Sequence, residues 1–568
     1  MQKTVAGLLV ATLYQIGVRH IFGVTGDAMH PLAKASREQD GMQWIEVRHD
    51  EGAALAASGQ AKLNGSLGVC CCTAGAGASR LIAGLNEAQK DHAPVLAISG
   101  GVPLGWRGND YLPENIPDLL FRDVCAYTQS LDNAERAAHV IHQAIAQAYS
   151  VRGVSHLYIP SEMFEARARM QVPSLATLRQ PPEIMADMAD IAEAVYLIGR
   201  ARNIAILAGE GCRSAIRLVL QLAQILHAPV IHSFRAKDMV AYAHPYWIGG
   251  VGLVGGAPGV EALRDADLVL MLGSDCPYGE FLPDHGRVVQ VDERPQVLGR
   301  RTSVQLGIVG SVGPAIFQII EQLPQRENRD FLRQVNRSRK KWDEMLDRKV
   351  APTHGDEPVK PEALVRAVSN KAQADAVVVI DTGIVTLWCG NWWRQSGRQR
   401  ILASFNNAAV GTSLGQANGV QILDRERQVI VAVGDDGFSM LMGEFMTSVE
   451  YRLPVKVVVF NHRERVLARL EMGTQGLPAR EQSEFPGLDF AAFAVACGAR
   501  GLSVKKTAEL EAGLQQLLDA PGPAILDVHI DPAELPALPH AGLEQAWGLS
   551  LERVKEVLLA IGRRKLKH

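Results

Sequence analysis

The sequence lacks the features that mark disulfide-stabilised, membrane-spanning and nucleic-acid-binding chains. Its eight cysteines include the run Cys70-Cys71-Cys72, which sits in an apolar strand-like segment without CxxC or Cys/His metal spacing. No apolar segment is long enough to span a bilayer, and the net charge of −3 has no long run of one sign apart from the short basic end 563–567. We therefore expect a cytoplasmic protein with reduced, buried cysteines and with neither a nucleic-acid nor a membrane partner.

The composition is that of an ordinary globular protein, with 47% hydrophobic and 21% charged residues in a chain of 568. Proline-marked breaks at 172–182 and 351–361 separate three blocks. The first and third blocks alternate helical patterns with short apolar strands and end alike, which predicts doubly wound parallel sheets and suggests a distant duplication. We predict an α/β fold with three such domains at 1–172, 183–335 and 358–535, followed by a C-terminal helix and basic end at 536–568.

The middle block contains two features of nucleotide-binding sheets. The apolar strand 288–292 ends in Asp292, and an acid at that position often holds a ribose or adenine. The glycine-rich run 249–256 does not clearly sit between a strand and a helix in the sequence. A tight loop and a nucleotide site therefore remain equal alternatives for this run in a central Rossmann-like domain.

The third block carries the strongest chemical signal. The apolar run 429–433 reads as a buried strand, and it leads into the turn Gly434-Asp435-Asp436-Gly437 and a helical pattern. A second strand, 455–460, ends at Asn461, and a βαβ unit brings Asn461 to the same carboxyl edge as Asp435. Mg²⁺ prefers such oxygen ligands and shares them with phosphates, while the glycine turn offers N–H groups to a diphosphate.

These residues give the chain a resemblance to the thiamine diphosphate (ThDP) family of pyruvate oxidases, acetolactate synthases and 2-oxo acid decarboxylases. Asp435 and Asn461 lie 26 positions apart (461 − 435), which matches the family signature. The likeness runs nearly end to end and resembles most the bacterial pyruvate:quinone oxidoreductase type. It also includes the segments Arg48-His49-Asp50-Glu51, His92-Ala93-Pro94-Val95, Ser404-Phe405-Asn406 and Leu543-Glu544-Gln545-Ala546.

The resemblance implies a pyrimidine-binding domain, a central domain that holds FAD in some members, and a diphosphate-binding domain. It also implies a homo-oligomer, dimer or tetramer, because the family's cofactor lies between two subunits. Asp435, the Asn461 side chain and the Arg463 carbonyl would hold Mg²⁺. The residues implied to contact the cofactor are Asp50, Gly383, Ile384, Asn406, Val410, Gly434, Asp435, Asp436, Gly437 and Asn461.

Several residues depart from the family pattern. Asp50 stands where a glutamate normally bonds the aminopyrimidine, and Glu51 is its neighbour on the same helix. The aspartate falls about 1.5 Å short, so a water or a backbone shift is needed. Asp436 replaces the second glycine of Gly-Asp-Gly and brings a carboxylate near the diphosphate, where like charges at ~4 Å cost about 1 to 4 kcal/mol.

The candidate catalytic residues are therefore Asp50, Glu51, His92 as a proton-transfer group, and Glu471, which matches an acid near the substrate side in pyruvate oxidases. Val410 stands in the place of the residue that bends the cofactor. We expect flavin to be absent or weakly held, because Val309-Gly310-Ser311 has serine where the quinone-linked relatives have an acid.

Three readings of function remain open, and the third, a nicotinamide dehydrogenase, carries little weight. The favoured one is a ThDP- and Mg²⁺-dependent enzyme that acts on a 2-oxo acid or related acyl donor, by decarboxylation, acyl transfer, or formation or cleavage of a C–C bond. The alternative is a catalytically impaired pseudoenzyme of the same fold with a binding or regulatory role. A nicotinamide dehydrogenase would need a Gly-x-Gly-x-x-Gly between strand and helix that we cannot place.

Overall fold

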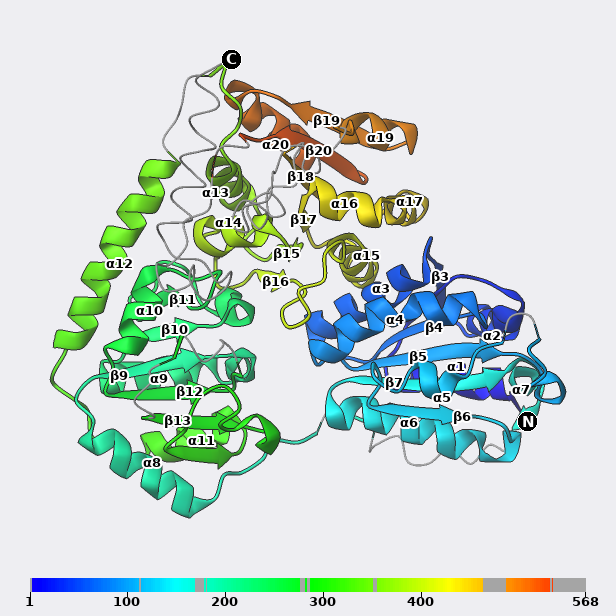
Figure 1. Cartoon of the computed structure of the whole chain (residues 1–568), viewed down its shortest axis with the longest axis horizontal. Coiled ribbons are helices and arrows are strands. Elements are labelled where there is room, and N and C mark those ends of the chain that lie inside the picture. Colours follow the sequence, from blue (N-terminus) through cyan, green and yellow to red (C-terminus); the bar gives the residue numbers. More distant parts are fainter. Residues whose placement is uncertain are drawn as a thin grey trace, which may run out of the picture.

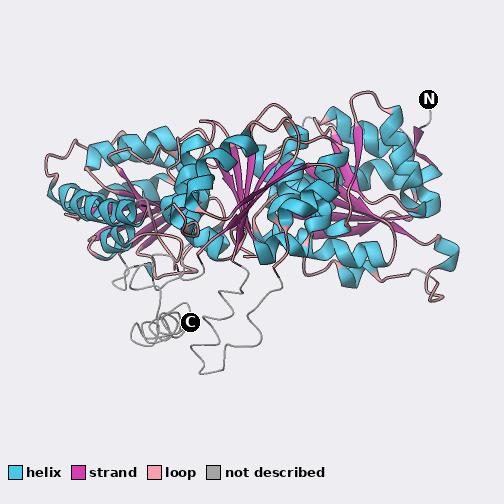
Figure 2. Ribbon diagram, turned by 90° about the horizontal axis from the view of Figure 1, so that it is seen from above, coloured by secondary structure: helices cyan, strands magenta, loops and turns pink. Residues whose placement is uncertain are grey.

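The computed structural model describes residues 3–111, 114–168, 178–179, 181–275, 281–282, 287–350, 355–462, 487–531 and 534. They form three α/β domains, each built on a six-stranded parallel sheet (Figure 1). The view from above shows helices on both sides of the sheets (Figure 2). This confirms the predicted fold class.

The first sheet has the strand order β3-β2-β4-β5-β7-β6, and the antiparallel pair β1 (Lys3–Thr4) and β8 (Arg167–Ala168) lies apart from it. Its strands are β2 (His20–Gly23), β3 (Gln43–Glu46), β4 (Gly68–Cys72), β5 (Val95–Gly101), β6 (Tyr127–Ser130) and β7 (Val154–Pro160). Its helices are α1 (Val5–Gln15), α2 (His30–Glu38), α3 (Asp50–Asn64), α4 (Ala76–Lys90), α5 (Pro117–Leu120), α6 (Ala137–Val151) and α7 (Ser161–Glu165).

The third sheet repeats this topology, with the order β16-β15-β17-β18-β20-β19. Its strands are β15 (Val377–Ile380), β16 (Arg400–Leu402), β17 (Val429–Gly434), β18 (Lys456–Asn461), β19 (Arg500–Val504) and β20 (Ala524–His529). Its helices are α13 (Pro361–Lys371), α14 (Ile384–Trp392), α15 (Ser413–Leu423), α16 (Asp435–Met440), α17 (Phe445–Glu450), α19 (Phe490–Ala496) and α20 (Leu510–Leu518). In chain order both sheets read 2-1-3-4-6-5, as a duplication would leave them.

The central sheet has the order β11-β10-β9-β12-β13-β14, which is the doubly wound order of dinucleotide-binding folds. Its strands are β9 (Ile204–Ala208), β10 (Val230–His232), β11 (Trp247–Gly250), β12 (Leu268–Leu272), β13 (Val288–Asp292) and β14 (Leu306–Val309). Its helices are α8 (Met188–Arg200), α9 (Ile216–Leu226), α10 (Ala257–Arg264) and α11 (Val312–Ile320), with the 3-10 segment η6 (Phe234–Met239), and α12 (Asp330–Lys349) leads to the third domain. The glycine run that the sequence could not place lies between β11 and α10.

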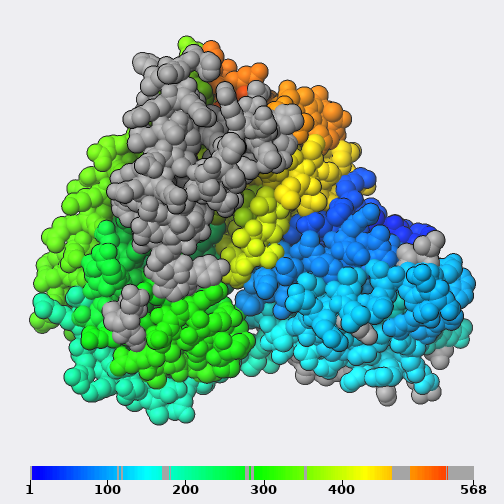
Figure 3. All heavy atoms as spheres, in the orientation of Figure 1, coloured from blue at the N-terminus to red at the C-terminus, as the bar shows by residue number. Residues whose placement is uncertain are grey.

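The first and third domains share one hydrophobic core, which is centred on helices α3 and α15. Glycines let these two equivalent helices approach closely. A Cβ atom on Gly59 would lie 2.4 Å from the Gln416 carbonyl oxygen, and one on Gly419 would lie 2.0 Å from that of Ala56. Figure 3 shows the two domains, blue and yellow, meeting over a continuous surface. The mutual orientation of the two domains is therefore set by backbone-to-backbone packing.

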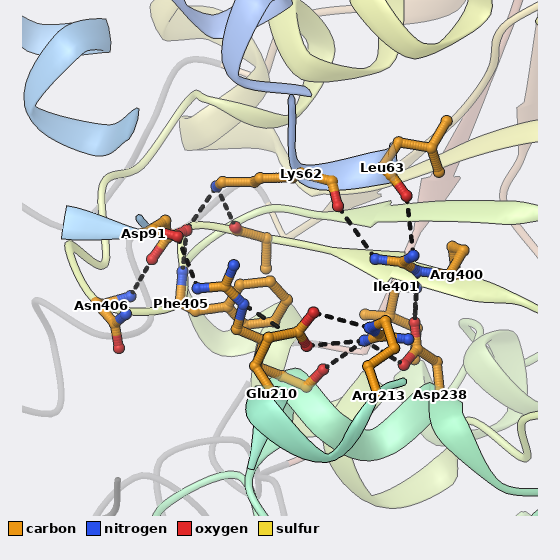
Figure 4. Close-up of polar contacts among 12 residues, drawn as sticks. Lys62, Leu63, Asp91, Glu210, Arg213, Asp238, Arg400, Ile401, Phe405 and Asn406 are labelled. Atoms are coloured by element: carbon orange, nitrogen blue, oxygen red, sulfur yellow. Dashed lines mark hydrogen bonds and ion pairs between the residues drawn. The ribbon is translucent and has the colours of Figure 1, made fainter. Parts of the chain in front are cut away.

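Charged residues from all three domains meet at a buried junction (Figure 4). Lys62 forms ion pairs with Glu87 and with Asp91, the latter at 2.5 Å, and all three side chains are almost fully buried. On the far side, Arg400 lies 3.3 Å from a carboxylate oxygen of Asp238 in the central domain. The junction therefore fixes the third domain against both of the others.

Among the residues that the structure describes, no helix is long and apolar enough to cross a membrane.

Candidate metal and cofactor site

Asp435 and Asn461 lie side by side at the carboxyl edge of the third sheet. Gly434, the last residue of β17, pairs in parallel with Phe460 of β18. The next residue in each segment, Asp435 or Asn461, therefore lies at the same edge of the sheet. Asp435 opens α16 and is 3% exposed, and Asn461 ends β18 and is 2% exposed. The apolar strands thus carry two oxygen-bearing side chains into a nearly dry site, as the βαβ pattern predicts.

The amide of Asn461 is held in one orientation by a buried acid, Asp527. The Asn461 Nδ2 donates to Asp527 Oδ1 at 2.8 Å and to the Leu488 carbonyl at 3.3 Å. The other oxygen of Asp527 accepts the backbone N–H of Phe490 at 3.1 Å. Asn461 Oδ1 has no hydrogen-bond partner among the described residues. A buried oxygen without a donor, next to a carboxylate, is a suitable ligand for a hard cation such as Mg²⁺.

Sequence reasoning missed Asp527, although a signal was present. Asp527 is the charged residue within the otherwise apolar run 524–528, and it reaches Asn461 because β18 and β20 are neighbours. A partner that fixes the orientation of a ligand typically changes metal affinity by about 10- to 100-fold when it is lost.

Asp527→Asn is expected to lower Mg²⁺ affinity by about 10- to 100-fold, since the new amide can donate to Asn461 Oδ1 and occupy the ligand oxygen. Mn²⁺ binding followed by electron paramagnetic resonance in the presence of ThDP measures this without turnover. Asp519→Asn is the matched control, because Asp519 is exposed and accepts only from Gln515 at its side chain. Equal metal affinity in the wild type and Asp527→Asn would refute the positioning role.

The turn that precedes α16 has the shape of a diphosphate cradle. A Cβ atom on Gly434 would meet nothing within 4 Å, and the same is true of Gly383, which has a φ of 134° and caps α14. Gly437 is packed tightly, because a Cβ atom there would lie 2.2 Å from Asp381 Oδ2 and 3.3 Å from Val410. Two helix N-termini thus lie at this edge with open space beside their glycines, an arrangement that suits an anion.

Asp381 anchors the loop that carries Val410. The Asp381 carboxylate accepts the N–H of Gly411 at 3.0 Å and of Thr412 at 3.2 Å. Asp381 is fully buried at the end of β15, and burial raises its pKa to about 7. Val410 itself is 40% exposed. The loop therefore presents Val410 next to the 434–437 turn.

Asp436 lies within the 434–437 turn and is half-buried. The Asp436 carbonyl oxygen accepts the Ser439 hydroxyl at 2.8 Å, which closes the first turn of α16. Its partial exposure to water lowers the electrostatic cost of a carboxylate near an anion.

Asp50 begins α3 in the first domain and is 3% exposed. Its Oδ1 has no hydrogen-bond partner among the described residues, and its Oδ2 lies 3.9 Å from Arg80. Burial raises the pKa of Asp50, and it also raises that of the half-buried Glu51. Asp50 is thus the more enclosed of the two carboxyl groups, and one of its oxygens is left for a partner.

Glu444 of the third domain fixes the turn that presents Asp50. The Glu444 Oε1 accepts the backbone N–H groups of Arg48 at 3.0 Å and of His49 at 2.8 Å. A Cβ atom on Gly52 would lie 2.3 Å from the same oxygen. No local pattern predicts this contact, since it joins segments almost 400 residues apart.

The structure places His92 and Asn406 at the domain junction, and His92 lies far along α4 from Asp50. His92 follows the C-terminal end of α4, about 22 Å along the helix from the end near Asp50. The His92 ring is hydrogen-bonded to Arg294, and burial followed by the Arg294 charge lowers its pKa to about 4. The backbone N–H of Asn406 donates to Asp91 Oδ1 at 2.7 Å. Both residues therefore lie at the domain junction within one chain.

The metal-ligand candidate Arg463, the candidate acid Glu471 and the segment 536–568 lie outside the described residues. His462 is described. Its ring stacks on Trp388 with centroids 5.3 Å apart, and its Nδ1 lies 3.7 Å from Asp435 Oδ1. The buried Trp388 thus supports the wall of the site from α14.

Comparison with known proteins places the chain in a family. Three models of the thiamine pyrophosphate (TPP, the same compound as ThDP) enzymes match the chain: the N-terminal TPP binding domain at residues 3–121, the central domain at 191–323 and the C-terminal TPP binding domain at 381–528. The chain is 32% identical over 529 residues to YdaP of Bacillus subtilis, whose name describes it as thiamine pyrophosphate-containing, covering 93% of this chain and 92% of that protein.

Two further relatives have named activities. A pyruvate oxidase of Lactiplantibacillus plantarum is 29% identical, with 85% of this chain and 80% of the relative covered. The large subunit of acetolactate synthase isozyme 1 of Escherichia coli is 24% identical, with 94% of each chain covered. The chain belongs to the thiamine pyrophosphate enzyme family, similar to pyruvate oxidases and acetolactate synthases.

Proposed function

We propose that the protein is a ThDP- and Mg²⁺-dependent enzyme that acts on a 2-oxo acid or a related acyl donor. The observation that carries the proposal is the unpartnered Asn461 Oδ1, which Asp527 holds beside Asp435. ThDP, when bound, supplies the electron sink for cleavage or formation of a bond next to a carbonyl carbon. Release of CO₂ from a panel of 2-oxo acids, with and without ThDP and Mg²⁺, tests the reaction; no dependence on either would refute it.

Each proposed role follows from a feature of the site. Asp435 and Asn461 hold the cation, with the Arg463 carbonyl as the third ligand implied by the family. The turn Gly434–Gly437 and the Gly383–Ile384 start of α14 face the diphosphate with N–H groups. Val410 supports the cofactor from the neighbouring loop.

Asp50 is proposed to hold and transfer a proton at its unpartnered Oδ1. A buried carboxyl with a raised pKa exchanges a proton at neutral pH more readily than an exposed one. Because the aspartate is one methylene shorter than the family's glutamate, we propose that a water molecule bridges the remaining distance. Asp50 is thus the altered part of the proposed active site. Its neighbour Glu51 could take its place only if α3 rotated about its axis.

The subunit arrangement implied by the family is a homo-oligomer, dimer or tetramer. We further propose a small-molecule substrate and, from the composition, a cytoplasmic location. The shortened acid at position 50 is also the observation that favours a second candidate, an impaired enzyme that retains the cofactor for a binding or regulatory role. The two candidates differ in proton exchange at the cofactor's C2 atom, which only an active site with a working proton path accelerates.

We further propose that flavin is absent or weakly held, and we expect a purified sample to be colourless. Ser311 stands where the quinone-linked relatives have an acid, and its hydroxyl already has hydrogen-bond partners within the chain. It donates to Glu293 at 2.6 Å and accepts the Ile184 N–H at 2.8 Å. Asp292 accepts the N–H of Arg294 at 2.9 Å. Absorbance at 450 nm after denaturation measures the content, and one flavin per chain would contradict this proposal.

A further inference from the structure

Three lysines are buried in the described part of the chain, and one of them, Lys237, has only an aromatic contact, with its Nζ 6.0 Å from the centre of the Tyr242 ring. Lys62 forms ion pairs with Glu87 and Asp91, and Lys456 donates to the carbonyls of Ala520 and Gly522. Lys237, which is 3% exposed, forms no hydrogen bond or ion pair with any described residue. An isolated buried ammonium is costly, so a compensating group is expected next to it.

Lys237 lines a cavity of about 30 Å³, which has room for one water molecule or one ion of similar size. The walls come from β11 and α10 of the central domain, from Trp342 of α12, and from Gly390 and Asn391 of α14. Trp247 also lines the cavity, and its indole N–H is buried without an acceptor among the described residues. Two residues that carry donor groups, one of them charged, thus line one small cavity.

The charges around the cavity leave a surplus of positive charge. Asp343 is the acid in the wall, but it accepts the Tyr242 hydroxyl and lies 3.7 Å from Arg339. The guanidinium groups of Arg339 and Arg394 lie 5.3 and 4.8 Å from the centre of the Tyr242 ring, and Arg394 also pairs with Asp347 at 2.6 Å. With Lys237, three cations thus stand against the two acids Asp343 and Asp347. Burial lowers the pKa of Lys237 to about 8, so the group still carries its charge at pH 7 for most of the time.

Water and an anion satisfy this cavity differently. Gln395 Oε1 also lacks a donor among the described residues, and a water molecule could donate a hydrogen bond to it. Water would, however, leave the charge of Lys237 uncompensated. An uncompensated buried charge costs more than an unpaired neutral oxygen. The balance therefore favours a negatively charged occupant.

We propose that this cavity binds a small monovalent inorganic anion of chloride size, through the Lys237 ammonium and the Trp247 indole N–H. Its walls join the central domain to α12 and to α14, whose first turn begins next to the proposed diphosphate cradle. The anion holds the central domain against the third domain. The site requires neither ThDP nor Mg²⁺, so its test is independent of the proposed function.

The direct test is diffraction from crystals of the wild-type protein grown in sodium bromide. We expect an anomalous peak in the cavity within about 3.4 Å of Lys237 Nζ. Water density in the cavity without an anomalous signal would overturn the proposal. This experiment needs no variant and holds even if substitutions at position 237 prevent folding.

The solution test compares melting temperatures in sodium chloride or bromide with those in sodium gluconate at equal ionic strength. Wild-type protein should melt higher in the halides, with a saturable dependence on concentration. Lys237→Met should weaken halide binding by at least about tenfold, and Trp247→Phe by a smaller factor. Lys456→Met is the matched control for the loss of a buried lysine and should retain the halide effect. An equal halide effect in Lys237→Met and the wild type would refute the site.

Discussion

Asp50→Asn is expected to slow turnover, and exchange of the C2 proton of bound ThDP, by about 10²- to 10⁴-fold, with little change in cofactor affinity. A placed carboxyl group that transfers a proton contributes this much to rate, equivalent to about 3 to 5 kcal/mol of barrier. The asparagine has nearly the same size, so the packing against Gly77 and Arg80 is preserved. Exchange is measured by NMR after acid quench, and affinity by calorimetry.

Asp50→Glu is the complementary variant, because it restores the methylene that the family's glutamate has. It should accelerate C2 exchange above the wild-type rate if distance limits proton transfer. Asp40→Asn, at an exposed carboxylate, controls for the loss of one charge. Wild-type exchange in Asp50→Asn, together with no gain in Asp50→Glu, would remove Asp50 from the proton path and favour the pseudoenzyme.

Lys62→Met is expected to cause the largest loss of stability, on the order of 3–5 kcal/mol. The substitution leaves Glu87 and Asp91 buried side by side without their cation. Asp91 also accepts the backbone N–H groups of Phe405 and Asn406, so the contact between the first and third domains is weakened as well. A lower urea midpoint of the unfolding step that these domains share measures the loss.

The pH dependence of Lys62→Met separates a charge effect from a packing effect. Burial already raises the pKa of Glu87 to about 7 in the presence of Lys62, and removal of the cation raises it further. The protonated acid is neutral, so the deficit should be greatest above pH 7 and should shrink as the pH falls toward 5. Lys34→Met, at an exposed Lys34–Glu38 pair, should match the wild type. A deficit in Lys62→Met that is constant from pH 5 to pH 8 would contradict the account.

The parts of the site that depend on local pattern could be predicted from the sequence. Asp435 and Asn461 meet because consecutive parallel strands of a βαβ unit end at one edge, and the apolar runs that precede them are unambiguous. The three sheets followed from the same alternation of patterns. The glycine run at 249–256 was left open because β11 is only four residues long and its strand pattern is weak.

The residues that could not be predicted act across long separations in sequence. Asp527 orients Asn461 from a neighbouring strand, and Glu444 holds the turn before Asp50 from another domain. Asn406, which the resemblance implies as a cofactor contact, also holds the third domain on Asp91 through its backbone N–H. Lys237 belongs to no motif. Its lack of a hydrogen bond or ion pair among the described residues is visible only when its neighbours in the structure are known. Each of these contacts depends on strand order or on domain packing, and neither can be read from local sequence patterns.

The central claim is that Asp435 and Asn461 hold Mg²⁺ for a bound ThDP, and one measurement tests it most directly. ThDP is titrated into the protein with Mg²⁺ or with EDTA while the melting temperature is recorded, and the same titration is repeated on Asp435→Ala. We predict a melting temperature that rises with the logarithm of ThDP concentration in Mg²⁺, and no rise in EDTA or in Asp435→Ala. No rise in the wild type with Mg²⁺, or an equal rise in Asp435→Ala, would contradict the claim.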